Sequence, residues 1–155
     1  MNNILYLLIG TYTMGLSAGI YVYKFNTETG VSEYVSVVET DNPSYLDMTD
    51  DGKFVYAVGE NDNEKAVAYA LSFDKEQGKL TLLNSERTYA ASPCNIVIDK
   101  SRKHVVTANY SGGSVTAFSV DADGKLAANP QLILFEGNGT DTVRQEMPHL
   151  HCVKF

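Results

Sequence analysis

The feature that most restricts the fold of this sequence is an internal repeat. The segment NPSYLDMTDDGKFVYAVGE at 42–60 matches SPCNIVIDKSRKHVVTANY at 92–110, with Pro43 aligned to Pro93, 50 residues further along the chain. A repeat of this length indicates copies of one supersecondary unit that bury their apolar faces against one another.

Each unit consists of short runs rich in Val, Ile, Tyr and Phe, separated by turns rich in Asp, Asn and Gly. Turn glycines recur at Gly30, Gly78 and Gly124. Such runs are typical of strands joined by hairpins, and no helical periodicity is sustained. Several runs, such as GIYVYKF at 19–25, are apolar on both alternating faces, as expected when a sheet packs between two others. The pattern predicts an all-β fold, a β-propeller of four-stranded antiparallel blades.

The strands of a unit can be assigned as a, b, c and d, with a innermost. In the first complete unit we expect a at 44–49, b at 53–59, c at 66–73 and d at 79–88. The predicted organisation is blade 1 without its inner strand at about 4–40, blade 2 at 43–88, blade 3 at 93–135, and the inner strand of blade 4 at 149–155.

Three blades are too few to close a ring, which usually needs about four to eight. We therefore expect this chain to be the N-terminal part of a longer propeller. In the alternative, the last strand a completes the first blade of a neighbouring copy and gives a closed oligomer. Either the remaining blades or another copy of the chain is needed to close the ring.

Charge and composition exclude several function classes. Twelve Lys and Arg against nineteen Asp and Glu give a net charge of −7, which should repel nucleic acid. Cys94 and Cys152 form no CxxC pair and are predicted to be free thiols, without a metal site. The apolar run near the N-terminus has no preceding Lys or Arg and reads as a strand, so no membrane partner is expected. We expect a cytoplasmic protein, or a periplasmic one if a leader has been removed.

Propeller topology predicts where a functional site lies. Strand a begins and strand b ends at the same rim, and the rim gathers polar and titratable side chains. They are Thr11, Tyr12, Asn42, Tyr45, Glu60, Asn61, Cys94, Asn95, Asn109, Tyr110, Arg144, Gln145, His149 and His151. We expect the asparagines at 42, 61 and 95 to bond loop backbone. The turns TETG, KEQG and DADG at the opposite rim look like ordinary solvated turns.

Arg144, His149 and His151 form the most suggestive group on this rim. Histidine titrates near neutral pH, and the guanidinium group of arginine binds carboxylate or phosphate through two N–H donors at once. In a regular strand, positions 149 and 151 face the same side. An HxH pair alone is weak evidence for catalysis, so a binding module remains open at this point.

The segments IGTYT, GIYVYKFNTETG, ANYSGGSV and RQEMPHLH add a specific resemblance. Together with the two repeats, they resemble the opening half of the lactonase family of seven-bladed propellers. That family includes the propeller type of 6-phosphogluconolactonase and the fungal carboxymuconate cyclases. One departure is Asn95, where the family usually has histidine.

The resemblance implies an enzyme that hydrolyses a lactone of the sugar type, with an anionic substrate and no metal or organic cofactor. It implies His151 and then His149 as proton-transfer groups, and Arg144 as the group that holds the anion. Substrate-binding residues would be Tyr12, Glu60, Asn109, Tyr110 and Gln145. The alternatives are a lactone-forming enzyme like the carboxymuconate cyclases, a non-catalytic binding propeller, or an interaction scaffold. Other charged site residues would come from later blades, so the chain alone is expected to be nearly inactive.

Overall fold

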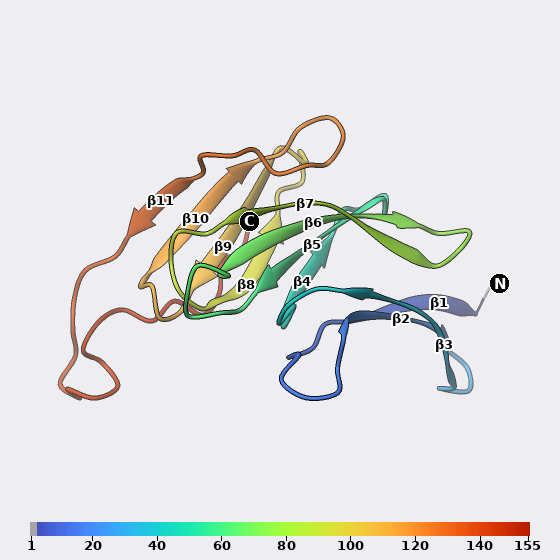
Figure 1. Cartoon of the computed structure of the whole chain (residues 1–155), viewed down its shortest axis with the longest axis horizontal. Coiled ribbons are helices and arrows are strands. Elements are labelled where there is room, and N and C mark those ends of the chain that lie inside the picture. The colour runs from blue at the N-terminus through green and yellow to red at the C-terminus, as the bar shows by residue number, and fades with distance from the viewer. Residues whose placement is uncertain (1–2) are drawn as a thin grey trace.

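Three antiparallel sheets make up the computed structural model, which describes residues 3–155 and contains no helix in that range (Figure 1). Blade 1 contains β1 (Ile4–Ile9), β2 (Gly19–Asn26) and β3 (Ser32–Glu39). Blade 2 contains β4 (Leu46–Met48), β5 (Phe54–Gly59), β6 (Val67–Asp74) and β7 (Lys79–Arg87). Blade 3 contains β8 (Pro93–Ile98), β9 (His104–Asn109), β10 (Ser114–Ser119) and β11 (Gln131–Leu134). The predicted all-β fold of antiparallel blades is confirmed.

The three blades lie side by side and bury apolar side chains between their faces. Alternate residues of β5 point to opposite faces of blade 2. Val55 packs with Ile20 of blade 1, whereas the next residue, Tyr56, packs with Phe118 of blade 3. All four side chains are fully buried. Burial on both faces explains why the strands of blade 2 lack a polar side.

Two of the three turns expected to be solvated, KEQG and DADG, lie on the preceding blade, whereas TETG at 27–30 is exposed as expected. The turn of blade 2 lies over blade 1, where the Ser36 hydroxyl donates a hydrogen bond to the carbonyl oxygen of Gly78 at 2.7 Å. The turn of blade 3 lies over blade 2, where the Tyr56 hydroxyl donates to the carbonyl oxygen of Gly124 at 3.1 Å. These two turns are therefore part of the contact with the preceding blade.

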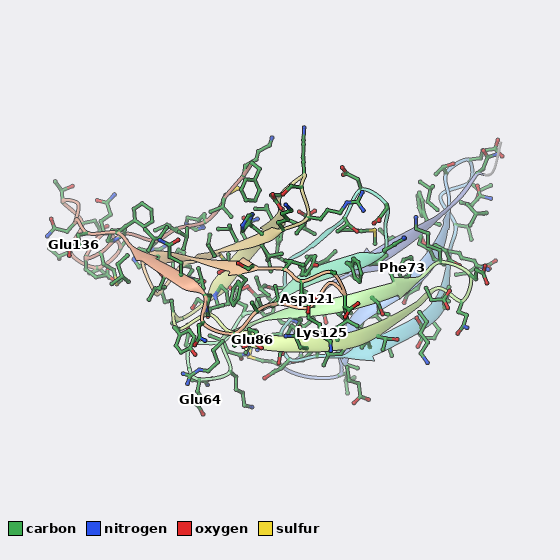
Figure 2. All side chains as sticks on the ribbon, turned by 90° about the horizontal axis from the view of Figure 1, so that it is seen from above. Glu64, Phe73, Glu86, Asp121, Lys125 and Glu136 are labelled. Atoms are coloured by element: carbon green, nitrogen blue, oxygen red, sulfur yellow. The ribbon has the colours of Figure 1, made fainter. Side chains whose placement is uncertain are left out.

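The residues just after the turn of blade 3 strengthen this contact. The side-chain amide of Asn84 on β7 donates to the carbonyl oxygen of Leu126 at 2.8 Å and accepts from the Leu126 backbone N–H at 3.1 Å. Figure 2 shows Asp121 and Lys125 of this turn close to Glu86 of β7. The outer strand of one blade thus holds the turn of the next.

Residues 149–155 do not form the strand predicted for them. The segment packs against blade 3 through side-chain atoms of β8. The Val153 backbone N–H donates to Oδ1 of Asn95 at 2.9 Å, and the Cys94 thiol donates to the carbonyl oxygen of Leu150 at 3.4 Å. A strand needs backbone hydrogen bonds to a neighbouring edge, and no strand of the described residues pairs with this segment.

The turn glycines give a prediction with a matched control. A Cβ added at Gly124 would lie 2.4 Å from two ring carbons of Phe54, whereas one added at Gly30 meets no atom within 4 Å. Both residues have positive φ, 82° and 73°, so they share the cost of placing alanine there. We expect Gly124→Ala to lower the free energy of unfolding by about 1–3 kcal/mol more than Gly30→Ala. Urea unfolding of the two variants measures the difference, and equal losses would contradict the packing of this turn on blade 2.

Candidate functional site

Six side chains form a continuous line along one rim of the blades, and they come from two equivalent positions of the repeat. Three follow the equivalent strands β1, β5 and β9: Tyr12, Glu60 and Tyr110. Three stand at or near the start of the innermost strand or its equivalent: Ser44, Cys94 and His151. Members of the two sets alternate along the line: Tyr12 comes from blade 1, blades 2 and 3 contribute one member of each set, and His151 follows blade 3. We call this set the rim line.

At one end of the rim line, Tyr12, Ser44 and Glu60 lie together. The Ser44 hydroxyl donates a hydrogen bond to the Glu60 carboxylate. Burial raises the pKa of Tyr12, and a hydrogen bond to Glu60 and the charge of that carboxylate raise it further. The Tyr12 hydroxyl therefore stays protonated, close to the Glu60 carboxylate. This end of the line is a carboxylate with two hydroxyl groups turned toward it.

Cys94 occupies the middle of the rim line. Burial raises the pKa of its thiol, and the negative charge of Glu60 adds to the effect. The thiol therefore stays protonated at neutral pH and is a poor nucleophile. Its hydrogen bond to the Leu150 carbonyl helps to hold the segment that carries the two histidines. As predicted, Cys94 and Cys152 are both free thiols.

The other end of the rim line consists of Tyr110 and the two histidines. The His149 ring stacks on Tyr110, with centroids 4.4 Å apart, and the His151 ring meets Tyr110 edge-on at 4.8 Å. Nδ1 of His149 lies 3.2 Å from the Tyr110 carbonyl oxygen, so it carries the proton in the neutral ring. Nε2 of His149 lies 3.5 Å from a carboxylate oxygen of Glu146, and the two attract each other only when this nitrogen is protonated as well. Both nitrogens of His149 thus face acceptor atoms of the chain, whereas His151 is exposed on the rim.

Asn109 was predicted to bind substrate, but its side chain is fully buried inside blade 3. Its amide donates to the hydroxyls of Ser114 and Thr116 at 3.0 and 2.9 Å, and its carbonyl accepts from Thr107 at 3.0 Å. Thr116 in turn donates to the backbone carbonyl of Thr88 on the rim. Asn109 cannot contact a ligand on the rim, and it fixes the end of β9 from which Tyr110 follows.

Arg144 and Gln145 lie on the loop after β11, which projects from the end of the molecule where Figure 2 labels Glu136. The Arg144 backbone N–H donates to Oδ1 of Asp141 at 3.0 Å, and within residues 3–155 its guanidinium group makes no hydrogen bond or ion pair. Oε1 of Gln145 accepts from the Asp141 backbone N–H at 3.3 Å, so this side chain closes its own loop. The structure does not bring either residue into contact with the histidines.

The three asparagines behave as expected and bond loop backbone. Oδ1 of Asn42 and Oδ1 of Asn95 each accept from a backbone N–H, at 2.8 and 2.9 Å. The amide of Asn61 donates to a backbone carbonyl at 3.3 Å. These side chains shape the loops of the rim and are not free for a ligand.

Sequence reasoning missed Ser44 and Glu146. The repeat contained a signal for Ser44, because it follows Pro43 as Cys94 follows Pro93. Nothing in the sequence pattern indicated that Glu146 faces His149.

Two further features of the structure bear on the choice of site. A hollow of about 650 Å³ lies at the opposite end of the sheets, between Tyr6, Lys24 and Lys75, away from the histidines. Within residues 3–155, no three His, Cys, Asp or Glu side chains are grouped so that they could hold a metal ion. The rim line is the place where titratable groups with perturbed pKa values and histidines meet, so we take it as the candidate site.

The family model described as "Lactonase, 7-bladed beta-propeller" matches residues 6–155. The chain belongs to this family. It is 36% identical to the 6-phosphogluconolactonase of Bacillus subtilis over 148 residues, which are 95% of this chain and 42% of that protein. It is 31% identical over 152 residues to the 6-phosphogluconolactonase of Formosa agariphila, covering 96% of this chain and 43% of that protein. The chain thus spans about two fifths of the length of the curated relatives that it matches.

Solved structures give the same result. A structure from Bacteroides fragilis assigned as a 6-phosphogluconolactonase has a TM-score of 0.94 and 49% identity, covering 99% of this chain and 42% of that one. The periplasmic gluconolactonase PpgL of Pseudomonas aeruginosa has a TM-score of 0.78 and 33% identity, covering 84% of this chain and 38% of that one. Both the propeller fold and the lactonase resemblance predicted from sequence are confirmed.

The effect of the Glu60 charge on Cys94 can be tested through pH. Because the Glu60 charge raises the pKa of Cys94, we expect Glu60→Gln to lower that pKa. In a Cys152→Ser background, the midpoint of the alkylation rate of Cys94 by iodoacetamide should then move to lower pH. Glu64→Gln, the same change at an exposed acid of the same loop, should leave the midpoint unchanged. An unmoved midpoint in Glu60→Gln would show that the carboxylate does not act on the thiol.

Proposed function

We propose that this chain supplies part of the active site of a lactone hydrolase of the 6-phosphogluconolactonase type, which acts on an anionic sugar lactone. The active form is a closed ring of blades, completed by further blades or by further copies of the chain. The observation that carries the proposal is the exposed imidazole of His151 at the end of the rim line. The names of the B. subtilis and F. agariphila relatives support the reaction class.

In the proposed reaction, His151 acts as general base. Its neutral ring takes a proton from a water molecule as the water attacks the lactone carbonyl carbon, and the ring C–O bond then breaks. His151 returns the proton to the departing ring oxygen, which becomes the hydroxyl of the product acid. General-base action contributes roughly two to four powers of ten to the rate, so other groups of the closed ring must also stabilise the transition state.

His149 has a different part in this proposal. One ring nitrogen is held by the Tyr110 carbonyl and the other faces Glu146, so its lone pair is not directed at a water on the rim. Stacking on Tyr110 fixes the plane of its ring. We assign His149 to the positioning of Tyr110, whose ring meets His151 edge-on and limits its rotation.

Arg144 remains our proposal for the group that binds the anionic part of the substrate. Its guanidinium group is exposed and, within the described residues, unpaired, so its five donors are available to a phosphate or carboxylate. The assignment comes from the RQ..PH.H motif, since no contact in this chain joins Arg144 to the histidines.

The general-base role gives a prediction with a matched control. We expect His151→Ala to lower turnover of 6-phosphogluconolactone by the closed ring at least tenfold, because the proton acceptor is lost. His104→Ala removes an exposed histidine near Asp99 on the opposite rim and should leave the rate unchanged. The rate is followed by the acid released per unit time, after subtraction of spontaneous hydrolysis. An unchanged rate in His151→Ala would remove His151 from the catalytic residues.

The need for a closed ring can also be tested. The described residues, 3–155, form three blades and no closed ring, so the monomeric chain should be nearly inactive toward lactones. The same lactonase assay, run on protein that sedimentation shows to be monomeric, measures this. Robust hydrolysis by such a monomer would mean that the rim line alone forms a complete site.

The compartment is a further proposal. The described residues contain no helix long and apolar enough to cross a membrane. We propose the cytoplasm, where the phosphorylated sugar acids that such an enzyme would act on are retained; the periplasmic relative from P. aeruginosa is the contrasting case.

A further inference from the structure

The two ends of the rim line differ in hydrogen-bonding chemistry. At the histidine end, the exposed ring of His151 can donate or accept a proton. At the other end, the Glu60 carboxylate can only accept hydrogen bonds, because an ionised carboxylate has about four lone-pair positions and no donor. Ser44 and Tyr12 occupy part of this capacity. The remaining lone pairs of Glu60 are available to donors on a ligand.

Backbone and asparagine hydrogen bonds also join the loops around Glu60, so its carboxylate is not the only link between them. The backbone N–H of Glu60 donates to the Asn42 carbonyl at 3.0 Å, and the Asn42 amide donates to Oδ1 of Asn61 at 2.8 Å. The Ser92 backbone N–H donates to the Asn61 carbonyl at 2.8 Å. These bonds join the loops of neighbouring blades without using the side chain of Glu60. Apart from its bond with Ser44, the half-buried carboxylate keeps lone pairs that these loop contacts do not use.

Hydroxyl groups are the ligand chemistry that fits this end. A carboxylate binds alcohol O–H groups by charge-assisted hydrogen bonds, which are shorter and stronger than neutral ones. It repels phosphate and carboxylate, because like charges at close range in a partly desolvated site are unfavourable. The anionic group of the substrate must then lie elsewhere, and the hydroxyl-bearing part of the ring must lie toward Glu60.

We propose that Glu60, supported by Ser44 and Tyr12, forms a hydroxyl-binding subsite that selects polyhydroxylated lactones over carboxylated lactones without ring hydroxyls. This inference rests on the proposed function, because it takes a lactone ring as the ligand. Ser44 is a positioning residue in it, since its hydroxyl fixes the carboxylate by the hydrogen bond to Glu60. The subsite disfavours the substrate class of the cyclase alternative, whose carboxylates would meet the charge of Glu60.

The test measures binding, so that it does not depend on hydrolysis. D-glucono-1,5-lactam and δ-valerolactam have the same six-membered ring with an amide in place of the ester, and only the first has hydroxyl groups. Isothermal titration gives the dissociation constant of each lactam for the closed ring. We expect Glu60→Gln to weaken gluconolactam binding at least tenfold, because a charged acceptor is lost, and to change valerolactam binding less than twofold.

Three further variants control the experiment. Glu64→Gln makes the same change on an exposed acid that Figure 2 shows projecting from the edge of the molecule, and it should leave both dissociation constants unchanged. Ser44→Ala keeps the carboxylate but frees it to rotate, so it should weaken gluconolactam binding less than Glu60→Gln does. His151→Gln should abolish hydrolysis of the lactone while retaining gluconolactam binding.

Each outcome decides the proposal. Selective loss of gluconolactam binding in Glu60→Gln supports it, even if the protein hydrolyses no lactone, in which case only the proposed function fails. Equal losses for both lactams would overturn it, because Glu60 would then act on the ring or on the fold and not on hydroxyls. Unchanged binding, or a native ring that does not prefer gluconolactam, would overturn it as well.

Discussion

Packing of sheet against sheet is the interaction on which the rest of this structure depends. Strands β5 and β6 carry apolar side chains on both faces because blade 2 has a neighbour on each side, as Val55 and Tyr56 show. Burial of apolar surface contributes roughly 25 cal/mol per Å², so every blade is stabilised mainly by its neighbours and much less by its own hairpins. The position of each strand end on the rim, and with it the candidate site, follows from this packing.

The rim line shows how a repeat can produce a site that is not itself repetitive. The repeat keeps the backbone of each unit alike, so equivalent positions arrive at the rim in regular order. Packing does not restrict the side chains at these positions. Tyr12, Glu60 and Tyr110 occupy equivalent positions of the repeat. The first two lie together, with the Tyr12 hydroxyl near the Glu60 carboxylate, whereas Tyr110 stacks on the His149 imidazole. The chemistry of the site therefore changes along a line whose geometry stays constant.

The parts of the structure that depend on local pattern could be predicted from sequence, and those that depend on contacts between units could not. Alternation and turn residues located the strands, and propeller topology located the rim. The burial of Asn109 was missed because the equivalent residue of blade 2 is Gly59, which has no side chain. In blade 2 the Tyr69 ring fills the space beside Gly59, whereas in blade 3 the Asn109 side chain fills the corresponding space itself. The position of Arg144 was missed because the loop after β11 belongs to no repeat. Ser44, by contrast, could have been predicted, since the repeat aligns it with Cys94, which was already placed on the rim.

The turn contacts give the row of blades a direction. Blades 2 and 3 each place a turn on the blade before, and blade 2 offers Phe54 and Tyr56 to the turn of blade 3, so its two interfaces use different surfaces. Such an interface is heterologous and repeats head to tail, which leads to a ring if the rotation closes and to an open filament if it does not. Two blades joined in this way cannot be related by a two-fold axis. The order and orientation of the units are therefore fixed locally, at every contact between neighbours, before any ring has closed.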